Sequence, residues 1–202
     1  MKQNNLNSLV GKVLVASPNL QGDHFFEKTL VYIFMHNKNG AFGIILNQKI
    51  DEISKRQLND IFYQVYESKI FSRFYIQSHQ RKLPIMLGGP VNTCCYITLS
   101  ISYAKQQIIT QYNSSYITLY FNIKNFLKDY IEKNRIHDFL FIKGVSIWEK
   151  GRIEEEVVNN DWFVVTPNFK KIFSQQSEHR WDFYIQALGL DKNSLVIPCV
   201  TN

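Results

Sequence analysis

The apolar runs of this sequence are short, and their length limits what the chain can fold into. Leu30–Met35 and Phe42–Leu46 are among the longest. Each is the size of a β-strand, whereas a membrane-spanning helix needs roughly 20 apolar residues. Between them lies His36-Asn37-Lys38-Asn39-Gly40, and asparagine and glycine tolerate the positive φ angles of tight turns. The pattern predicts a β-hairpin with strands over 29–35 and 41–46, and no association with a membrane.

The rest of the chain mixes strand and helix patterns without a strict β-α-β alternation. This mixture favours an α+β or mixed α/β fold: one compact domain with a mixed, pseudo-barrel-like β-sheet packed by several helices. We expect a flexible polar N-terminus over residues 1–8 and a single domain over 9–202. Further strands are predicted at 10–16, 83–87, 96–100, 116–121, 139–145 and 162–165. Four helices are also predicted. The first covers 54–67 and begins with a Ser54/Gln57 capping box, and the second follows the capping residue Asn122. The third covers 151–160, and the fourth covers 177–188 and ends before Gly189.

Composition narrows the class of protein. Of 202 residues, 45% are hydrophobic and 20% charged, which excludes the composition of a disordered chain. The polar N-terminus does not resemble a secretory signal, and an odd count of three cysteines, including the adjacent Cys94 and Cys95, argues against a disulfide framework. A cytoplasmic location is therefore expected. The net charge of +6 permits weak, non-specific nucleic-acid binding, although the basic residues are scattered in ones and twos.

Three blocks of the sequence carry a family signature. They are Leu14-Val15-Ala16-Ser17-Pro18 followed by Asp23, Phe25, Val31-Tyr32-Ile33, His36-Asn37, Gly40-Ala41, Gly43 and Asn47; then Gly88-Gly89-Pro90-Val91; and then Trp148, Gly151, Glu154, Glu156, Asn160 and Trp162, with Trp181, Leu188 and Gly189 near the end. Together they resemble the AlgH/YqgE family of bacterial proteins over nearly the whole chain. The resemblance implies a cytoplasmic protein with a compact mixed α/β fold and a proposed role in transcriptional regulation. It implies no established reaction, cofactor or partner.

The chain departs from the family pattern in one region. The family typically has Gly-Tyr-Ala-Gly-Trp where this chain has Gly144-Val145-Ser146-Ile147-Trp148, and Gly-Gln-Leu-Glu where it has Gly151-Arg152-Ile153-Glu154. If this segment forms a ligand or catalytic site in the family, its version here is altered.

A small hydrolase is one hypothesis for the function. Ser17, Asp23, His24 and His36 lie within twenty residues of one another, and nucleophilic catalysis by serine needs a base and a third group that orients the base. The strand-to-helix elbow Gly-x-Ser-x-Gly is missing from the sequence. Ser17 before Pro18 is more simply the turn residue that ends a strand.

Binding candidates are concentrated in loops. His36, Asn37 and Gly40 could hold a small anion in a hairpin loop, although turn geometry explains the same residues, and Gly43 with Asn47 fits a close approach of neighbouring backbone. Gly88-Gly89-Pro90 lacks the Lys-Ser/Thr ending of a phosphate-binding loop, so a tight turn is favoured.

Acidic and aromatic residues are concentrated near the predicted helix at 151–160. Glu154, Glu155 and Glu156 fan around a helix, which indicates a solvated acidic face. Trp148 and Trp162 flank the helix and fit core packing better than an aromatic rim for a partner. Metal-ligand spacings such as Cys-x-x-Cys are missing from the sequence, so we expect neither a metal nor a cofactor.

These observations favour a non-enzymatic binding or regulatory protein that acts through an unidentified protein partner. Its surface would combine the His36 loop, the Gly88-Gly89-Pro90 turn and the segment from Trp148 to Trp162 with Glu154 and Asn160. The alternatives are the hydrolase and the weak nucleic-acid binder.

Overall fold

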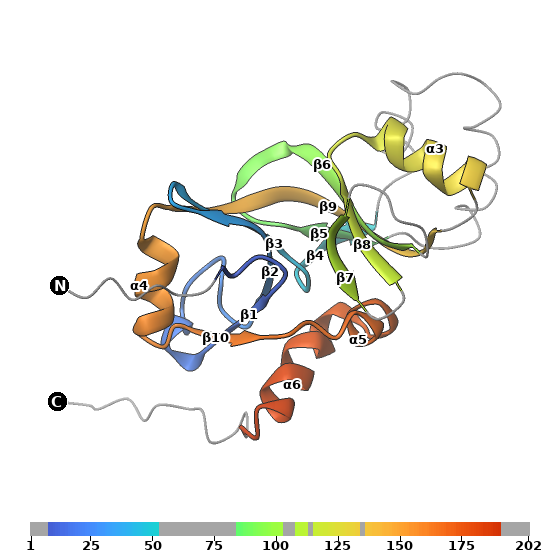
Figure 1. Cartoon of the computed structure of the whole chain (residues 1–202). Helices are drawn as coiled ribbons and strands as arrows, with labels where there is room; N and C mark the ends of the chain where they lie inside the picture. The colour runs from blue at the N-terminus through green and yellow to red at the C-terminus, as the bar shows by residue number, and fades with distance from the viewer. Residues whose placement is uncertain (1–7, 53–83, 103–107, 113–114, 134–135, 191–202) are drawn as a thin grey trace, which may run out of the picture. The chain divides into compact units, whose positions relative to one another are not determined.

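The structure is a computed structural model that describes residues 8–52, 84–102, 108–112, 115–133 and 136–190 (Figure 1). These residues divide into two compact units, each assembled from stretches that are separate in the sequence. Unit 1 comprises the described residues of 8–48, 88–91 and 145–190, and unit 2 comprises those of 49–87 and 92–144. The predicted helix at 54–67 lies outside the described residues, and the prediction of one domain over 9–202 stays a prediction.

Unit 1 is built on an antiparallel sheet with the strand order β10-β1-β2-β3-β9. The strands are rich in β-branched and aromatic residues, which favour extended backbone. The predicted hairpin is confirmed, and a bulge between Ile33 and Met35 shifts its register. The elements are β1 (Val13–Ala16), η1 (Pro18–Leu20), β2 (Leu30–Asn37), β3 (Gly40–Ile45), the end of β9 (Ile136–Glu149), α4 (Arg152–Val158), β10 (Trp162–Val165), α5 (Phe169–Ser174) and α6 (Ser177–Ala187).

Both faces of the unit 1 sheet are buried, because alternate residues of each strand point to opposite sides. One face is packed around Leu14, Val31, Trp148 and Trp162 together with Ile153 of α4. On the other face Tyr32 meets Phe169 of α5 edge to face, with ring centroids 5.5 Å apart. Helix α4 contacts β3 and β10, and α6 contacts β1 and α5 (Figure 1). Each of the two apolar cores is therefore formed by side chains of the strands together with side chains of the helices.

Unit 2 contains β4 (Lys49–Glu52), β5 (Pro84–Leu87), all but the first residue of β6 (Val91–Ser102), β7 (Ile108–Tyr112), β8 (Ser115–Tyr120), α3 (Ile123–Lys133) and the first part of β9. β5 pairs with β9 in parallel, whereas β4 pairs with β5, and β6 and β7 pair with β8, in antiparallel fashion. The predicted mixed sheet and the α+β fold class are thus confirmed. Phe126 of α3, the helix predicted after Asn122, is fully buried and contacts the rings of Tyr120, Phe139 and Phe141.

The last two helices differ in how well the sequence predicts them. α6 ends as predicted: Gly189 has a φ of 75°, and the N–H of Leu190 donates to the carbonyl of Ile185 at 3.1 Å, which is the hydrogen bonding of a glycine-terminated helix. α5 was not predicted. Its six residues are too few to show a helical period, and its start is fixed by Asn168, whose side chain accepts from the N–H of Lys171.

Candidate functional site

His36 joins three parts of unit 1 that are distant in the sequence. Its side chain is only 7% exposed, and Nε2 lies 3.0 Å from Oε1 of Glu154 in α4. Its Nδ1 accepts the backbone N–H of Leu9 at 3.0 Å. Because Nδ1 is an acceptor, the proton of the neutral ring is on Nε2 and is donated to Glu154. The imidazole therefore clamps the segment before β1 and helix α4 to the hairpin.

Glu156 is the polar centre of the packing around α4. Its Oε2 accepts the indole N–H of Trp148 at 2.8 Å and that of Trp162 at 2.9 Å. Its Oε1 accepts Nε of Arg152 at 2.9 Å, one helical turn earlier. Buried indole N–H groups need acceptors, and a single carboxylate supplies both. Glu156 therefore anchors the helix to β9 and β10.

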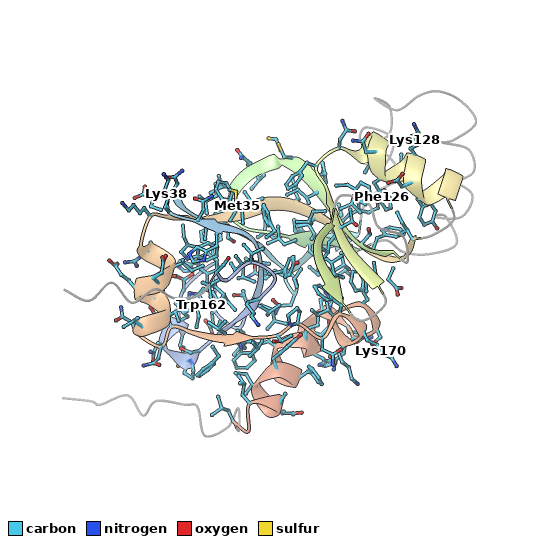
Figure 2. The ribbon with its side chains drawn as sticks, in the orientation of Figure 1. Met35, Lys38, Phe126, Lys128, Trp162 and Lys170 are labelled. Carbon is cyan, nitrogen blue, oxygen red and sulfur yellow. The ribbon has the colours of Figure 1, made fainter. Side chains whose placement is uncertain are left out.

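Phe26 completes an aromatic cluster with the two tryptophans. Its ring stacks on Trp148 with centroids 5.7 Å apart and meets Trp162 edge to face at 5.5 Å. Trp162 lies beside α4 in Figure 2. Both tryptophans are buried, which confirms the prediction that they pack in the core.

An open hollow of about 520 Å³ lies over one edge of this cluster. Ile147, on the outward side of β9, is 40% exposed and gives the hollow an accessible apolar surface. The departures from the family pattern at Ile147 and Arg152 both fall in its lining. The lining residues are Phe26, Ile147, Trp148, Glu149, Lys150, Arg152, Glu155 and Glu156.

The hydrolase candidates are used in local hydrogen bonds. The hydroxyl of Ser17 accepts the N–H of Asn19 at the start of η1. Asp23 Oδ1 accepts the N–H groups of Phe25 and Phe26, both at 2.8 Å, and His24 is exposed. Within the described ranges, no hydrogen bond joins Ser17 to an imidazole, so the geometry of a serine-histidine-acid triad is not formed there.

The hairpin candidates have structural partners as well. The side chain of Asn37 accepts the N–H of Asn39, and Gly40 has a φ of 132°, as the predicted turn requires. A Cβ at Gly43 would lie 2.6 Å from Val31 Cγ1, so the groups that approach this glycine are side chains and not the neighbouring backbone that was predicted. Asn47 accepts the N–H of Leu30 at 2.7 Å and donates to the carbonyl of Lys28 at 2.8 Å.

The Gly88-Gly89-Pro90 turn packs against β9 and β3. A Cβ at Gly89 would lie 2.3 Å from the carbonyl carbon of Val145. The carbonyl of Gly88 accepts the N–H of Ile45 at 2.9 Å and the hydroxyl of Ser146 at 3.1 Å. These contacts hold the segment against β3 and β9, and the preference for a tight turn over a phosphate cradle stays a prediction.

Two predictions about the surface were wrong. The carboxylates of α4 do not form a solvated acidic face: Glu155 is exposed, but Glu154 and Glu156 are turned to His36 and to the tryptophans. The predicted docking face is also incomplete, because Trp148, Trp162, Gly88 and Gly89 are buried. Asn160 is a turn residue with a φ of 62°. Its carbonyl accepts the side-chain amide of Asn19.

Sequence reasoning missed Phe26, Ile147, Lys150 and Arg152 as candidates. The one local signal was the spacing of Arg152 and Glu156, four residues apart, which allows an ion pair on a helix. The contacts of Phe26 join residues more than 120 positions apart, as the ring pair with Trp148 does, and no pattern in the sequence indicates them.

Other features of the described residues bear on the class of protein. Groups of three or more potential metal ligands are not found among them. None of their helices is long and apolar enough to cross a membrane. Lys38 lies in the turn between β2 and β3, Lys128 on α3 and Lys170 on α5 (Figure 2).

Comparisons with known proteins agree with the architecture. Residues 13–193 match the AlgH-like family. UPF0301 proteins of Rickettsia typhi and Rickettsia africae are 28% and 29% identical over 187 residues, which are 92% of this chain and 92% of each relative.

Two solved structures have a similar fold. The solution structure of the AlgH protein from Pseudomonas aeruginosa has a TM-score of 0.63 and 20% identity, with all of both chains covered. The crystal structure of protein DIP2367 from Corynebacterium diphtheriae has a TM-score of 0.63 and 19% identity, covering 93% of this chain and 90% of the other. Since the family match covers most of the sequence, this chain belongs to the AlgH-like family.

Proposed function

We propose that the protein is a non-enzymatic binding protein of the bacterial cytoplasm that acts through a protein partner docked at the hollow beside α4. Any effect on transcription would then be exerted through that partner. The observation that carries the proposal is Ile147, an apolar side chain left 40% exposed in an open hollow with a charged rim. Apolar surface surrounded by polar groups is typical of interaction sites.

The chemistry of the hollow supports a protein partner. Its base offers the rings of Phe26 and Trp148, and its rim carries Lys150, Arg152 and Glu155. This is an apolar centre with charges of both signs around it, which is the usual anatomy of a protein interface. The side chains of Arg152 and Glu155 are 62% and 69% exposed, so a partner would reach them without unfolding α4.

The hydrolase alternative receives less support from the same region. Both ring nitrogens of His36 are already engaged with Glu154 and Leu9, and Ser17 is a helix cap. A general base needs a free nitrogen within reach of the proton it removes. Direct binding of nucleic acid is also less favoured, because the basic residues are scattered along the sequence in ones and twos.

The test is quantitative affinity capture from cell lysate with three forms of the full chain. Ile147→Asp places a charge in the hollow. Val158→Asp is the matched control, because Val158 lies on the same helix as the rim, is 59% exposed, and is not part of the lining. Thermal unfolding of each form checks that the fold is retained.

We expect at least one protein that the wild type and the Val158→Asp variant capture equally and that the Ile147→Asp variant captures at least tenfold less. If every captured protein is retained by the Ile147→Asp variant, docking at the hollow is rejected. Turnover of ester or amide substrates that disappears in Ser17→Ala would instead support the hydrolase.

A further inference from the structure

We infer that His36 is a proton-operated clamp, which releases the backbone of Leu9 when the imidazole is protonated and keeps its hold on α4. The inference does not depend on the proposed function. It rests on the different roles of the two ring nitrogens, both of which lie 3.0 Å from their partners in a side chain that is 7% exposed.

The two contacts respond differently to the same proton. The backbone N–H of Leu9 can only donate, so it is bonded to His36 only while Nδ1 carries a lone pair. A proton on Nδ1 turns that nitrogen into a second donor, and the two N–H groups then face each other. On the other side of the ring, Nε2–H donates to Glu154 whether the ring is neutral or charged, and a positive ring strengthens that bond. Protonation therefore breaks one contact and reinforces the other.

The surroundings of the imidazole favour this directional response. Glu154 of α4 is the acidic group within ion-pair distance, and its second oxygen, Oε2, is buried without a hydrogen-bond partner among the described residues. Its negative charge is therefore available to an imidazolium. Arg152, on the same helix, pairs with Glu155 and Glu156.

The neighbouring lysines outside α4 are either hydrogen-bonded or exposed. Lys12 Nζ, on the segment that His36 clamps, bonds to Thr166 Oγ1 at 3.3 Å. Lys38 on the hairpin and Lys150 before α4 are exposed. The positive charge of a protonated imidazole is therefore balanced by Glu154 of α4, which lies on the side of the ring opposite to Leu9.

The release is confined to the few residues before β1. Leu9 is buried, so its N–H loses its acceptor in a place where water does not readily replace it. Two residues later the chain is anchored independently, because the N–H of Gly11 donates to the carbonyl of Ile33 at 2.8 Å and the carbonyl of Lys12 accepts the N–H of Ile33 at 2.9 Å. The strand therefore stays in the sheet while the N–H of Leu9 loses its acceptor.

The clamp is tested by amide hydrogen exchange followed by NMR on the full chain at pH 7.5 and pH 5.5. Protection factors, corrected for the intrinsic pH dependence of exchange, are compared for Leu9 and for the reference amide of Ile33. We expect the protection of Leu9 to fall at least tenfold at pH 5.5 while that of Ile33 changes less than twofold.

The variant His36→Gln separates the effect of protonation from the effect of the two hydrogen bonds. A glutamine amide offers one acceptor and one donor, as the neutral imidazole does, but takes up no proton at its acceptor oxygen. We expect its Leu9 amide to have the same protection at both pH values. Equal protection of Leu9 in the wild type at both pH values, or the same tenfold loss in His36→Gln, would overturn the clamp.

A second measurement is independent of any variant. The ¹⁵N shifts of the His36 ring in the wild type report which nitrogen carries the proton. We expect a bare Nδ1 and a protonated Nε2 wherever the Leu9 amide is protected, and protons on both nitrogens wherever that protection is lost. A ring protonated at Nδ1 already at pH 7.5 would contradict the inference.

Discussion

Oε2 of Glu156 accepts the indole N–H of Trp162 at 2.9 Å, and this bond fastens α4 to the edge strand β10. The same oxygen accepts Trp148 of β9. A charged group placed among aromatic rings is normally costly, but here three donors satisfy it. The polar contact fixes where the helix lies, and the helix in turn forms one rim of the hollow.

The first prediction concerns this carboxylate. Glu156→Ala leaves two buried indole N–H groups without an acceptor, and we expect a loss of about 3 kcal/mol of unfolding free energy in urea titrations. Glu156→Gln keeps one carbonyl oxygen for the indoles and should lose about 1 kcal/mol. The control is Glu155→Ala, whose side chain is 69% exposed and whose loss should stay within about 0.5 kcal/mol. Equal losses at positions 155 and 156 would contradict the anchoring role.

The second prediction separates a steric clash from backbone strain at two glycines. Gly40 and Gly22 both have positive φ angles, 132° and 85°, but a Cβ at Gly40 would lie 2.2 Å from the carbonyl oxygen of Trp148, whereas one at Gly22 would meet no atom within 4 Å. We expect Gly40→Ala to cost about 3 kcal/mol and Gly22→Ala about 1 kcal/mol in chemical denaturation. A smaller loss for Gly40→Ala than for Gly22→Ala would mean that β3 and β9 separate easily at this point.

How far the sequence predicts this molecule depends on how local each signal is. The strand Trp162–Val165 was predicted with the observed bounds, because its aromatic and β-branched run ends at Thr166-Pro167. The roles of Glu154 and Glu156 were not predicted, since adjacent carboxylates look solvated until the elements that face them are known. Their partners, His36 and the two tryptophans, are placed by strand order. The strands β4 and β7 were not predicted; three of the four residues of β4 are charged, so it lacks the apolar run of a strand.

The third prediction uses pH. Burial raises the pKa of the Tyr120 hydroxyl well above its usual value, and the charge of Asp129, which accepts its hydrogen bond at 3.1 Å, adds to the effect. The unfolded chain loses this proton near pH 10, before the folded chain does. Tyr120 therefore stabilises the fold below about pH 10, and this contribution is lost as the pH rises further.

The measurement is urea unfolding at pH 8, 10 and 11 for the wild type and for Tyr120→Phe. We expect the wild type to lose more stability than the variant between pH 10 and pH 11, since phenylalanine does not ionise. Parallel losses in the two proteins would show that this tyrosine does not contribute to alkaline destabilisation.

The fourth prediction tests Asn47 as a structural link. Its side chain bonds to both the N–H of Leu30 and the carbonyl of Lys28. Asn47→Ala removes both bonds, and Asn47→Asp keeps the acceptor for Leu30 but replaces the donor to Lys28 by a carboxylate oxygen. We expect losses of about 2 kcal/mol for alanine and about 1 kcal/mol for aspartate by thermal or urea unfolding. An unchanged stability of the alanine variant would reopen this residue as a ligand-binding candidate.

The most direct test of the account places a photo-crosslinking amino acid at Ile147 of the full chain in living cells, with the same residue at Val158 as the control. If the hollow is the docking surface, irradiation should join position 147 to one reproducible protein, and position 158 should give at least tenfold less of that product. Equal products at both positions, or no protein product at position 147 while the fold is retained, would contradict the proposal that the hollow beside α4 docks a protein partner.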